Sequence, residues 1–477
     1  MDKTEIAKLA HRMTGKDDLL ALLNRIKQEE IRGMEPAGEF YPFTMKHINY
    51  YCNPNNLYRF NQFKIKKKTG GYRQITAPKN KNFTLLLRCV NEIFKSIYTP
   101  SNYAMGFTEG RSVVANADAH KGQNYILNID LKDFFPSIGQ ARVWKRLQIE
   151  PFNFPQPVAN LLAGLCAMKE KRTMEDGTEK DVYVLPQGAP TSPIITNMIC
   201  DTLDRRLAGL ARRFNLRYTR YADDITFSSM HNVYQAGSDF NKELARIIQG
   251  QGFTINEKKT RLQKTGGRQE VTGIIVSSKL NVTQKYVRDI RNLLYIWDRY
   301  GYTAAYAKFF PKYREEKGHV KKNVPDLANV LYGKLMYLKM VKGENDSVYK
   351  RLQTKFEKLT EKTSHQMKTN AYAITYSETM PLLEFEQKYS TEVIFAASGN
   401  HRYAYFMLKG NKCLVSINKA VETETEQKKE ILSISLCHNQ QNKPFWLIHL
   451  NTKKAASPSI SVDIDELNKE LDTLLNP

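Results

Sequence analysis

Residues 220–228 have the sequence RYADDITFS, which predicts much of the fold. Aromatic and β-branched residues on both sides favour two strands, whereas Asp223 and Asp224 interrupt the run and predict a break between them. Adjacent carboxylates repel each other unless a cation neutralises them. The stretch therefore predicts a strand pair that presents two acids at its tip, as a divalent metal site requires.

A third acid lies at the end of a separate strand. Asp130 ends the apolar run Tyr125–Ile129. A single Asp at a strand end is usually a turn or cap residue. Two acidic sites together suit Mg²⁺, which takes carboxylate oxygens plus substrate phosphates. Two such ions stabilise both oxygens of an in-line phosphoryl displacement, so the pattern predicts a phosphoryl-transfer centre.

Five sequence boxes resemble those of reverse transcriptases and stand in the same order as in that family. They are the YxDD box at 221–224, LPQGAPTSP at 185–193, the first palm aspartate motif at 128–135, a basic fingers motif at 66–78 and the next palm element at 252–259. A four-letter string recurs by chance, whereas five ordered boxes do not. The resemblance covers roughly residues 60–280 and implies an RNA-directed DNA polymerase.

The resemblance implies which residues hold the metals. Asp130 and Asp223 would bind two Mg²⁺ ions, Asp224 would support or share them, and the backbone of Leu131 would add a ligand. The 3′-hydroxyl of a primer would then attack the α-phosphate of a dNTP, and pyrophosphate would leave.

A dNTP site follows from the same resemblance. Its expected residues are Lys67, Arg73, Phe135, Gln187, Gly188 and Lys258. Cations on a hairpin can close over a triphosphate, although Lys66–Lys68 could equally be a solvated charge run. Gly188 would let the nucleotide and template approach a bare backbone. Phe135 would block a 2′-hydroxyl and so select dNTPs over rNTPs, unless it is simply a core aromatic.

Two further strings resemble motifs of retron reverse transcriptases. Residues 116–120, NADAH, match NAxxH before the first palm aspartate, and residues 271–273 match VTG after the palm. Asn116 and His120 would share one face of a helix and contact RNA edges or 2′-hydroxyls, although His120 could instead cap or pack. Gly273 in a strand suggests close approach of the primer. Asn116, His120 and the VTG residues Val271, Thr272 and Gly273 are therefore the predicted RNA and primer contacts.

A retron-type enzyme implies a cognate structured non-coding RNA that is both template and primer. The product would be single-stranded DNA in a branched RNA–DNA hybrid started from a 2′-hydroxyl. The family further implies antiphage defence with an effector protein. Two alternatives remain open: another bacterial reverse transcriptase, defence-associated or of the group II intron kind, and a catalytically dead RNA-binding scaffold. The three clustered acids weigh against the scaffold, and the lack of an endonuclease-like C-terminal pattern weighs against the intron enzyme.

The charge of the chain is unevenly distributed. The 477 residues carry a net charge of +23, yet residues 371–477 hold only 11 Lys and Arg against 13 Asp and Glu. The first 370 residues therefore contain the whole excess, which predicts a polyanionic partner for that part. On the helix expected over 283–300, Lys285, Arg288 and Arg291 form a stripe predicted to follow RNA phosphates. The basic loop 312–322 is a further candidate for contact with RNA.

We expect an α+β right-hand polymerase. Its parts are a helical N-terminal extension (1–50), fingers and palm (51–280), a helical thumb (281–370) and a small, mostly β accessory domain of open role (371–477). The last part shows five strand-like runs and an amphipathic helix at 463–475.

No stretch of the sequence approaches the roughly 18 consecutive apolar residues of a membrane-spanning helix. Six scattered cysteines and a polar N-terminus predict a cytoplasmic protein with no membrane contact.

Overall fold

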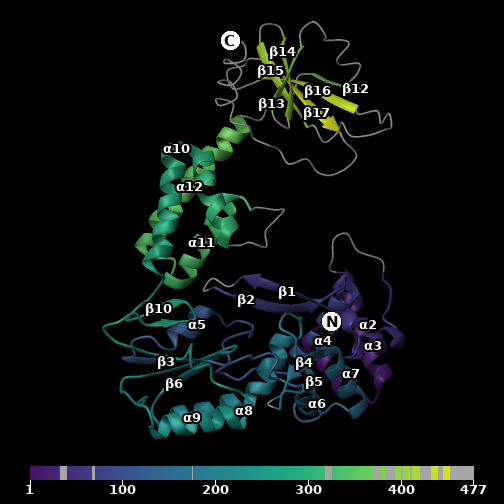
Figure 1. The fold of residues 1–477 in the computed structure, drawn as a ribbon, viewed down its shortest axis with the longest axis vertical. Helices are drawn as coiled ribbons and strands as arrows, with labels where there is room; N and C mark the ends of the chain where they lie inside the picture. Colours follow the sequence, from purple (N-terminus) through teal and green to yellow (C-terminus); the bar gives the residue numbers. More distant parts are fainter. Residues whose placement is uncertain are drawn as a thin grey trace. The chain divides into compact units, whose positions relative to one another are not determined.

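The computed structural model describes residues 1–32, 40–66, 70–174, 176–316 and 325–369, together with six strands between 376 and 451 (Figure 1). Side chains are described as far as residue 361. The chain divides into two compact units, Met1–Glu357 and Lys358–Pro477. The finer domain boundaries stay predictions.

A four-stranded antiparallel sheet carries the acidic residues. Its order is β6 (Arg217–Tyr221), β7 (Asp224–Ser229), β3 (Tyr125–Asp130) and β8 (Arg261–Lys264). β3 and β7 pair in a register that sets Asp130 directly opposite Asp224. β6 and β7 pair across the turn between them, with Tyr221 opposite Asp224. The predicted strand at 125–130 and the predicted strand pair are therefore confirmed.

The two faces of this sheet meet different elements. α8 (Ser192–Arg213) packs on β6 and on α9 (Asp239–Gly250), and both helices lie along the sheet in Figure 1. Successive strand residues point to opposite faces. Tyr218 accordingly bonds to Asp204 on α8, whereas Thr219 bonds to His120 on the other side.

A small module covers the second face. It contains α5 (Val113–Asp118) and the strands β9 (Glu270–Val271), β10 (Ile274–Val276) and β11 (Leu280–Asn281). These three strands form one antiparallel sheet, and α5 packs against β10 and β6.

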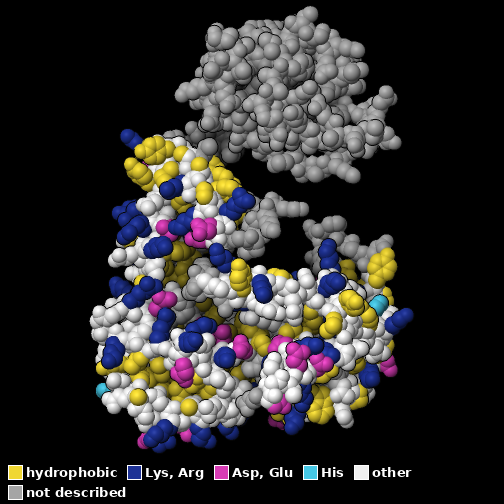
Figure 2. All heavy atoms as spheres, in the orientation of Figure 1, with side chains coloured by type: hydrophobic (Ala, Val, Ile, Leu, Met, Phe, Trp, Pro, Cys, Tyr) yellow, Lys and Arg dark blue, Asp and Glu magenta, His cyan; other side chains and the backbone are white. Residues whose placement is uncertain are grey.

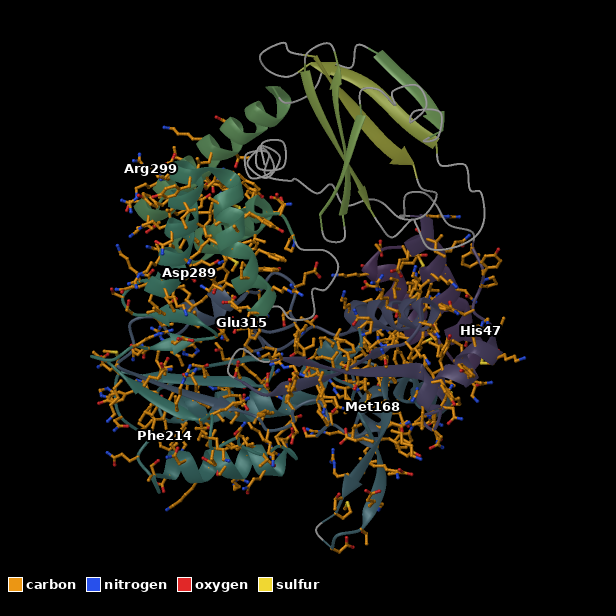
Figure 3. All side chains as sticks on the ribbon, turned by 45° about the horizontal axis from the view of Figure 1, so that its top comes forward. His47, Met168, Phe214, Asp289, Arg299 and Glu315 are labelled. Carbon is orange, nitrogen blue, oxygen red and sulfur yellow. The ribbon has the colours of Figure 1, made fainter. Side chains whose placement is uncertain are left out.

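Helices and two hairpins make up the rest of the region before residue 217. The helices are α1 (Lys3–His11), α2 (Lys16–Arg32), α3 (Met45–Cys52), α4 (Lys81–Ile97), α6 (Gln140–Leu147) and α7 (Gln156–Cys166). The hairpins are β1 (Phe60–Lys66) with β2 (Tyr72–Pro78), and β4 (Met168–Thr173) with β5 (Glu179–Val184). Figure 3 shows the second hairpin extending from Met168. α1 and α2 are separated by a short break, where the Asp18 carboxylate accepts hydrogen bonds from the backbone of Thr14 and Gly15.

Three helices follow the sheet region, in the part of the chain that was expected to be helical. They are α10 (Gln284–Glu316), which is kinked at Gly301, α11 (Leu327–Lys342) and α12 (Ser347–Thr369). On α10, the apolar side chains of Ile290, Leu294 and Trp297 are buried in the core. In the described part of the chain, no helix combines the length and apolarity that crossing a membrane requires.

Six strands of the second unit are described. They are β12 (Tyr376–Pro381), β13 (Val393–Ser398), β14 (His401–Leu408), β15 (Asn411–Asn418), β16 (Ile431–His438) and β17 (Pro444–Asn451). They form two antiparallel sheets, β12-β16-β17 and β13-β14-β15. Strands occupy all five predicted runs, and β12 adds one that was not predicted. The helix expected at 463–475 lies outside the described residues.

Candidate active site

The turn between β6 and β7 brings three acids to one end of the sheet. Ala222 adopts the left-handed backbone conformation (φ 57°), which reverses the chain within two residues. Asp223 and Asp224 follow it, and Asp130 lies opposite Asp224 on β3. The backbone N–H of Leu131 donates to the carbonyl of Asp223 at 3.1 Å, which ties the end of β3 to the turn. Residues about ninety apart in sequence thus share one short edge.

The acids perturb one another. Removal from solvent raises the pKa of Asp223, and the charge of Asp130 raises it further. The pKa of Asp224 rises to about 6, first because packed protein displaces water and then because Asp223 and Asp130 repel its charge. Lys259 opposes both shifts. Mutual repulsion of this kind favours a bound cation.

Lys259 and Asn256 hold the carboxylate of Asp130. Lys259 Nζ donates to Asp130 Oδ1 at 2.7 Å, and Asn256 Nδ2 donates to Oδ2 at 2.9 Å. Both residues belong to the loop after α9, whose Asn256 N–H also donates to the Asp130 carbonyl. Lys258, which the sequence predicted as a dNTP contact, is exposed, and its neighbour Lys259 is the lysine that contacts Asp130. The sequence alone does not show which of the two adjacent lysines reaches Asp130, because that depends on the path of the loop.

The donors suit a hard divalent ion. Asp130, Asp223 and Asp224 supply carboxylate oxygens, and the Leu131 backbone lies beside them. Within the described ranges, no three His, Cys, Asp or Glu side chains form a group that could hold a metal ion. Mg²⁺ is commonly held by one or two carboxylates with substrate phosphates completing its shell. The donor set therefore fits an ion that a nucleotide helps to bind.

The β1–β2 hairpin docks on the loop that contains Gln187 and Gly188. The Thr76 N–H donates to the Gln187 carbonyl at 2.8 Å. Gly188 has φ 133°, and a Cβ there would lie 2.8 Å from Ile75 Cγ2 and 3.0 Å from the Thr76 carbonyl oxygen. In this structure β2 therefore occupies the space that glycine leaves, whereas the sequence predicted a nucleotide or template there.

Two other members of the predicted dNTP set can be placed, and one cannot. Arg73 is exposed on β2. Its positive charge lowers the pKa of Asp223, so Arg73 lies near the acids. Phe135 is half-buried, and its ring centroid lies 5.6 Å from that of Phe134 and 6.3 Å from that of Phe107. Lys67 lies outside the described residues.

The NAxxH and VTG strings meet in one buried network. Asn116 Nδ2 donates to Thr272 Oγ1 at 3.3 Å. Asn116 Oδ1 accepts the Thr219 hydroxyl at 2.6 Å. His120 lies 2.7 Å from both Thr219 Oγ1 and Ser228 Oγ. Since the single Thr219 proton goes to Asn116, His120 Nε2 must donate to Thr219, and its Nδ1 accepts from Ser228.

This placement contradicts direct RNA contact by Asn116 and His120. Both side chains are fully buried, and α5 ends at Asp118, so that His120 lies in the following turn instead of on the helix. Their hydrogen bonds join α5 to β6, to β7 and to the turn after β9. Val271 is also buried, whereas Gly273 is exposed with φ 83°. Within the two strings, the exposed backbone of Gly273 is therefore the candidate for contact with nucleic acid.

The neutral state of His120 predicts a pH-dependent stability. Burial lowers the pKa of His120 to about 3. Between the unfolded value of 6.5 and this folded value, the unfolded chain binds a proton that the folded chain does not, so that stability falls as the pH falls. The loss is about 2 kcal/mol between pH 6.5 and pH 5. His120→Gln should reduce that dependence in urea unfolding, compared with the exposed-site variant His231→Gln. An unchanged dependence in His120→Gln would rule out the histidine as its source.

The region of the chain that contains this site is similar to known proteins. A family model described as reverse transcriptase (RNA-dependent DNA polymerase) matches residues 65–283, which contain the sheet and all three acids. Retron Mx65 reverse transcriptase of Myxococcus xanthus is 38% identical over 257 residues, 53% of this chain and 59% of that protein. Retron Ec73 reverse transcriptase of Escherichia coli is 31% identical over 233 residues, 46% of this chain and 69% of that protein. The chain belongs to the retron-type reverse transcriptases.

The coverage of these relatives is partial. The match spans 59% of the Mx65 protein and 55% of Retron Ec86 reverse transcriptase of Escherichia coli, which is 38% identical over 194 residues, 40% of this chain. Among solved structures, telomerase from Candida albicans aligns over 64% of this chain and 63% of its own, at 11% identity and a TM-score of 0.35.

Proposed function

We propose that this chain is an RNA-directed DNA polymerase of retron type, which copies part of a cognate structured RNA into single-stranded DNA. The observation that carries the proposal is the convergence of Asp130, Asp223 and Asp224 at one end of the sheet. A scaffold that only bound RNA would have no use for three repelling acids there. Membership of the retron-type reverse transcriptases supports the same function.

In this proposal each region has a part in a right-hand polymerase. The four-stranded sheet with α8 and α9 is the palm, the β1–β2 hairpin belongs to the fingers, and α10–α12 form the thumb. The strands after residue 371 form an accessory domain. The docking of the hairpin on the Gln187–Gly188 loop supports the assignment, because it brings Arg73 to the acids.

The reaction would be a two-metal nucleotidyl transfer. Two Mg²⁺ ions, when bound, would activate the primer hydroxyl and neutralise charge on the phosphates. Asp130 and Asp223 would hold them, with Asp224 and the Leu131 backbone completing the protein ligands. Lys259 keeps the Asp130 carboxylate oriented. Arg73 and Lys67 would bind the triphosphate of the dNTP.

Basic residues of α10 suit the nucleic-acid backbone. Lys285, Arg288 and Arg291 are all exposed on one stripe of that helix. Figure 2 shows many Lys and Arg side chains over the visible face of α10–α12. Cations along a helix can neutralise successive phosphates without regard to sequence. The stripe is our candidate surface for the RNA template and its DNA product.

The proposal is tested by the nucleic acid that the chain makes in cells. The gene is expressed with its flanking RNA-coding region, and total nucleic acid is extracted. We expect a short species that both RNase and DNase shorten, since a branched hybrid contains both chains. Cells that express the Asp223→Asn variant with the same flanking region should lack it. If the species forms equally with and without Asp223, this chain does not synthesise it.

A further inference from the structure

We propose that a buried ion pair between Arg220 and Asp204 positions the acidic turn for metal binding. Both side chains are fully buried, so both would act through the backbone of the turn. The inference rests on the proposed polymerase function for its meaning, and it adds positioning residues to the metal ligands that the family resemblance implies.

Arg220 contacts both Asp204 and the acidic turn. It lies on β6, three residues before Asp223, and its side chain is fully buried. Its Nε and Nη2 donate to the two oxygens of Asp204, both at 2.7 Å, in a bidentate pair. Its Nη1 donates to the carbonyl oxygen of Ala222 at 3.2 Å. One guanidinium therefore links helix α8 to the turn that carries the acids.

Stability alone does not explain such a pair. Removing two charges from water is costly, and the attraction between them often only offsets that cost. Apolar residues of the same volume would fill the site about as well. An apolar side chain could not hold the Ala222 carbonyl, however, and the arginine fork can. The hydrogen bond to the Ala222 carbonyl is therefore the contact that requires arginine.

The contact acts on the peptide next to Asp223. The Ala222 carbonyl belongs to the planar peptide group whose nitrogen is that of Asp223. Holding this carbonyl fixes the plane of that peptide and so restricts the direction of the Asp223 side chain. The turn needs such support, because the left-handed conformation of Ala222 (φ 57°) is unfavourable in a residue that carries a Cβ.

A second element supports the same turn from the segment 103–106. Met105 N–H donates to the Arg220 carbonyl at 2.7 Å. A Cβ on Gly106 would lie 2.7 Å from the Ala222 nitrogen. Asn197 connects the two supports, since its Nδ2 donates to the Gly106 carbonyl at 3.0 Å and its Oδ1 accepts from Arg220 Nη2 at 3.1 Å. The turn is therefore enclosed on both sides by groups that touch its backbone.

Three variants separate positioning from simple stabilisation. Arg220→Lys keeps the charge but loses the fork, and Gly106→Ala pushes on the Ala222 nitrogen from the other support. Tyr218→Phe is the control, because it removes a hydroxyl that donates to the same Asp204 at 2.7 Å and leaves the turn contacts intact. Each full-length variant is assayed for thermal unfolding, RNA binding, single-dNTP addition, and Mn²⁺ binding by electron paramagnetic resonance.

We expect Arg220→Lys and Gly106→Ala to bind RNA normally, to bind Mn²⁺ several-fold more weakly and to add dNTP roughly 10²-fold more slowly, the loss typical of a misplaced group. Tyr218→Phe should lower only the unfolding temperature. Wild-type Mn²⁺ affinity in both Arg220→Lys and Gly106→Ala would overturn the proposal. If Arg220→Lys fails to fold, Gly106→Ala decides alone. If the wild-type chain makes no DNA, the polymerase proposal fails, and Mn²⁺ binding still decides this one.

Discussion

Asp223→Asn is expected to abolish DNA synthesis, slowing single-dNTP addition by roughly 10³-fold or more. A lost metal ligand removes several kcal/mol of transition-state stabilisation, and each 1.4 kcal/mol is about a factor of ten in rate. RNA binding should not change, because the candidate phosphate contacts lie on α10. The measurement is a rapid-mixing assay of one dNTP addition, beside a titration of RNA binding.

The same substitution should not destabilise the protein. The raised pKa of Asp223 means that the folded chain holds its proton more tightly than the unfolded chain. That contribution to stability is present at low pH and is lost as the pH rises through the folded pKa, so the charge disfavours the fold at neutral pH. Asp133→Asn is the matched control, since it removes an exposed charge three residues from Asp130. Equal losses of activity in both variants would contradict the role of Asp223 as a ligand.

Phe135→Ala is expected to admit rNTPs. The ring of Phe135 is half-buried in the loop after Asp130, supported by Phe134 and Phe107. If it excludes a 2′-hydroxyl sterically, its removal should lower the preference for dNTP over rNTP by about 10- to 10²-fold, the range that one small group in a pocket controls. The measurement compares kcat/KM for dGTP and GTP on the same primed RNA.

A variant that keeps the ring provides the control for that result. Phe135→Tyr retains the bulk and should retain the preference for dNTPs. If Phe135→Ala incorporates rNTPs no better than the wild type, Phe135 is a packing residue and another group selects the sugar.

The residue pattern within single strands was enough to predict the acids that lie at the strand ends. The run 125–130 and the pair broken at 223–224 have strand periodicity with acids at their ends, so the sheet and its acidic edge could be inferred from the sequence. The order of the boxes then implied the family. Helices α6, α7 and α9 and the β4–β5 hairpin were not predicted, because no family box lies in them.

Long-range contacts could not be predicted in the same way. Asn116 and Thr272 are 156 residues apart, and His120 and Thr219 are 99 apart. An amide and an imidazole in a motif look alike whether they face RNA or a core, and only the fold buries these two. Asp204 did leave a trace in the sequence, since a charge between Leu203 and Leu207 on an apolar helix face needs a partner. Which cation supplies it depends on the path of β6.

If this chain copies RNA into DNA, the sequence of its product must depend on the RNA template. The purified chain is given Mg²⁺, all four dNTPs, a primer and one of two RNA templates that differ at a single position. We expect DNA complementary to each RNA, with the one difference reproduced in the product, and no product when the RNA is digested beforehand. DNA of the same sequence from both templates, or DNA formed without RNA, would contradict this expectation.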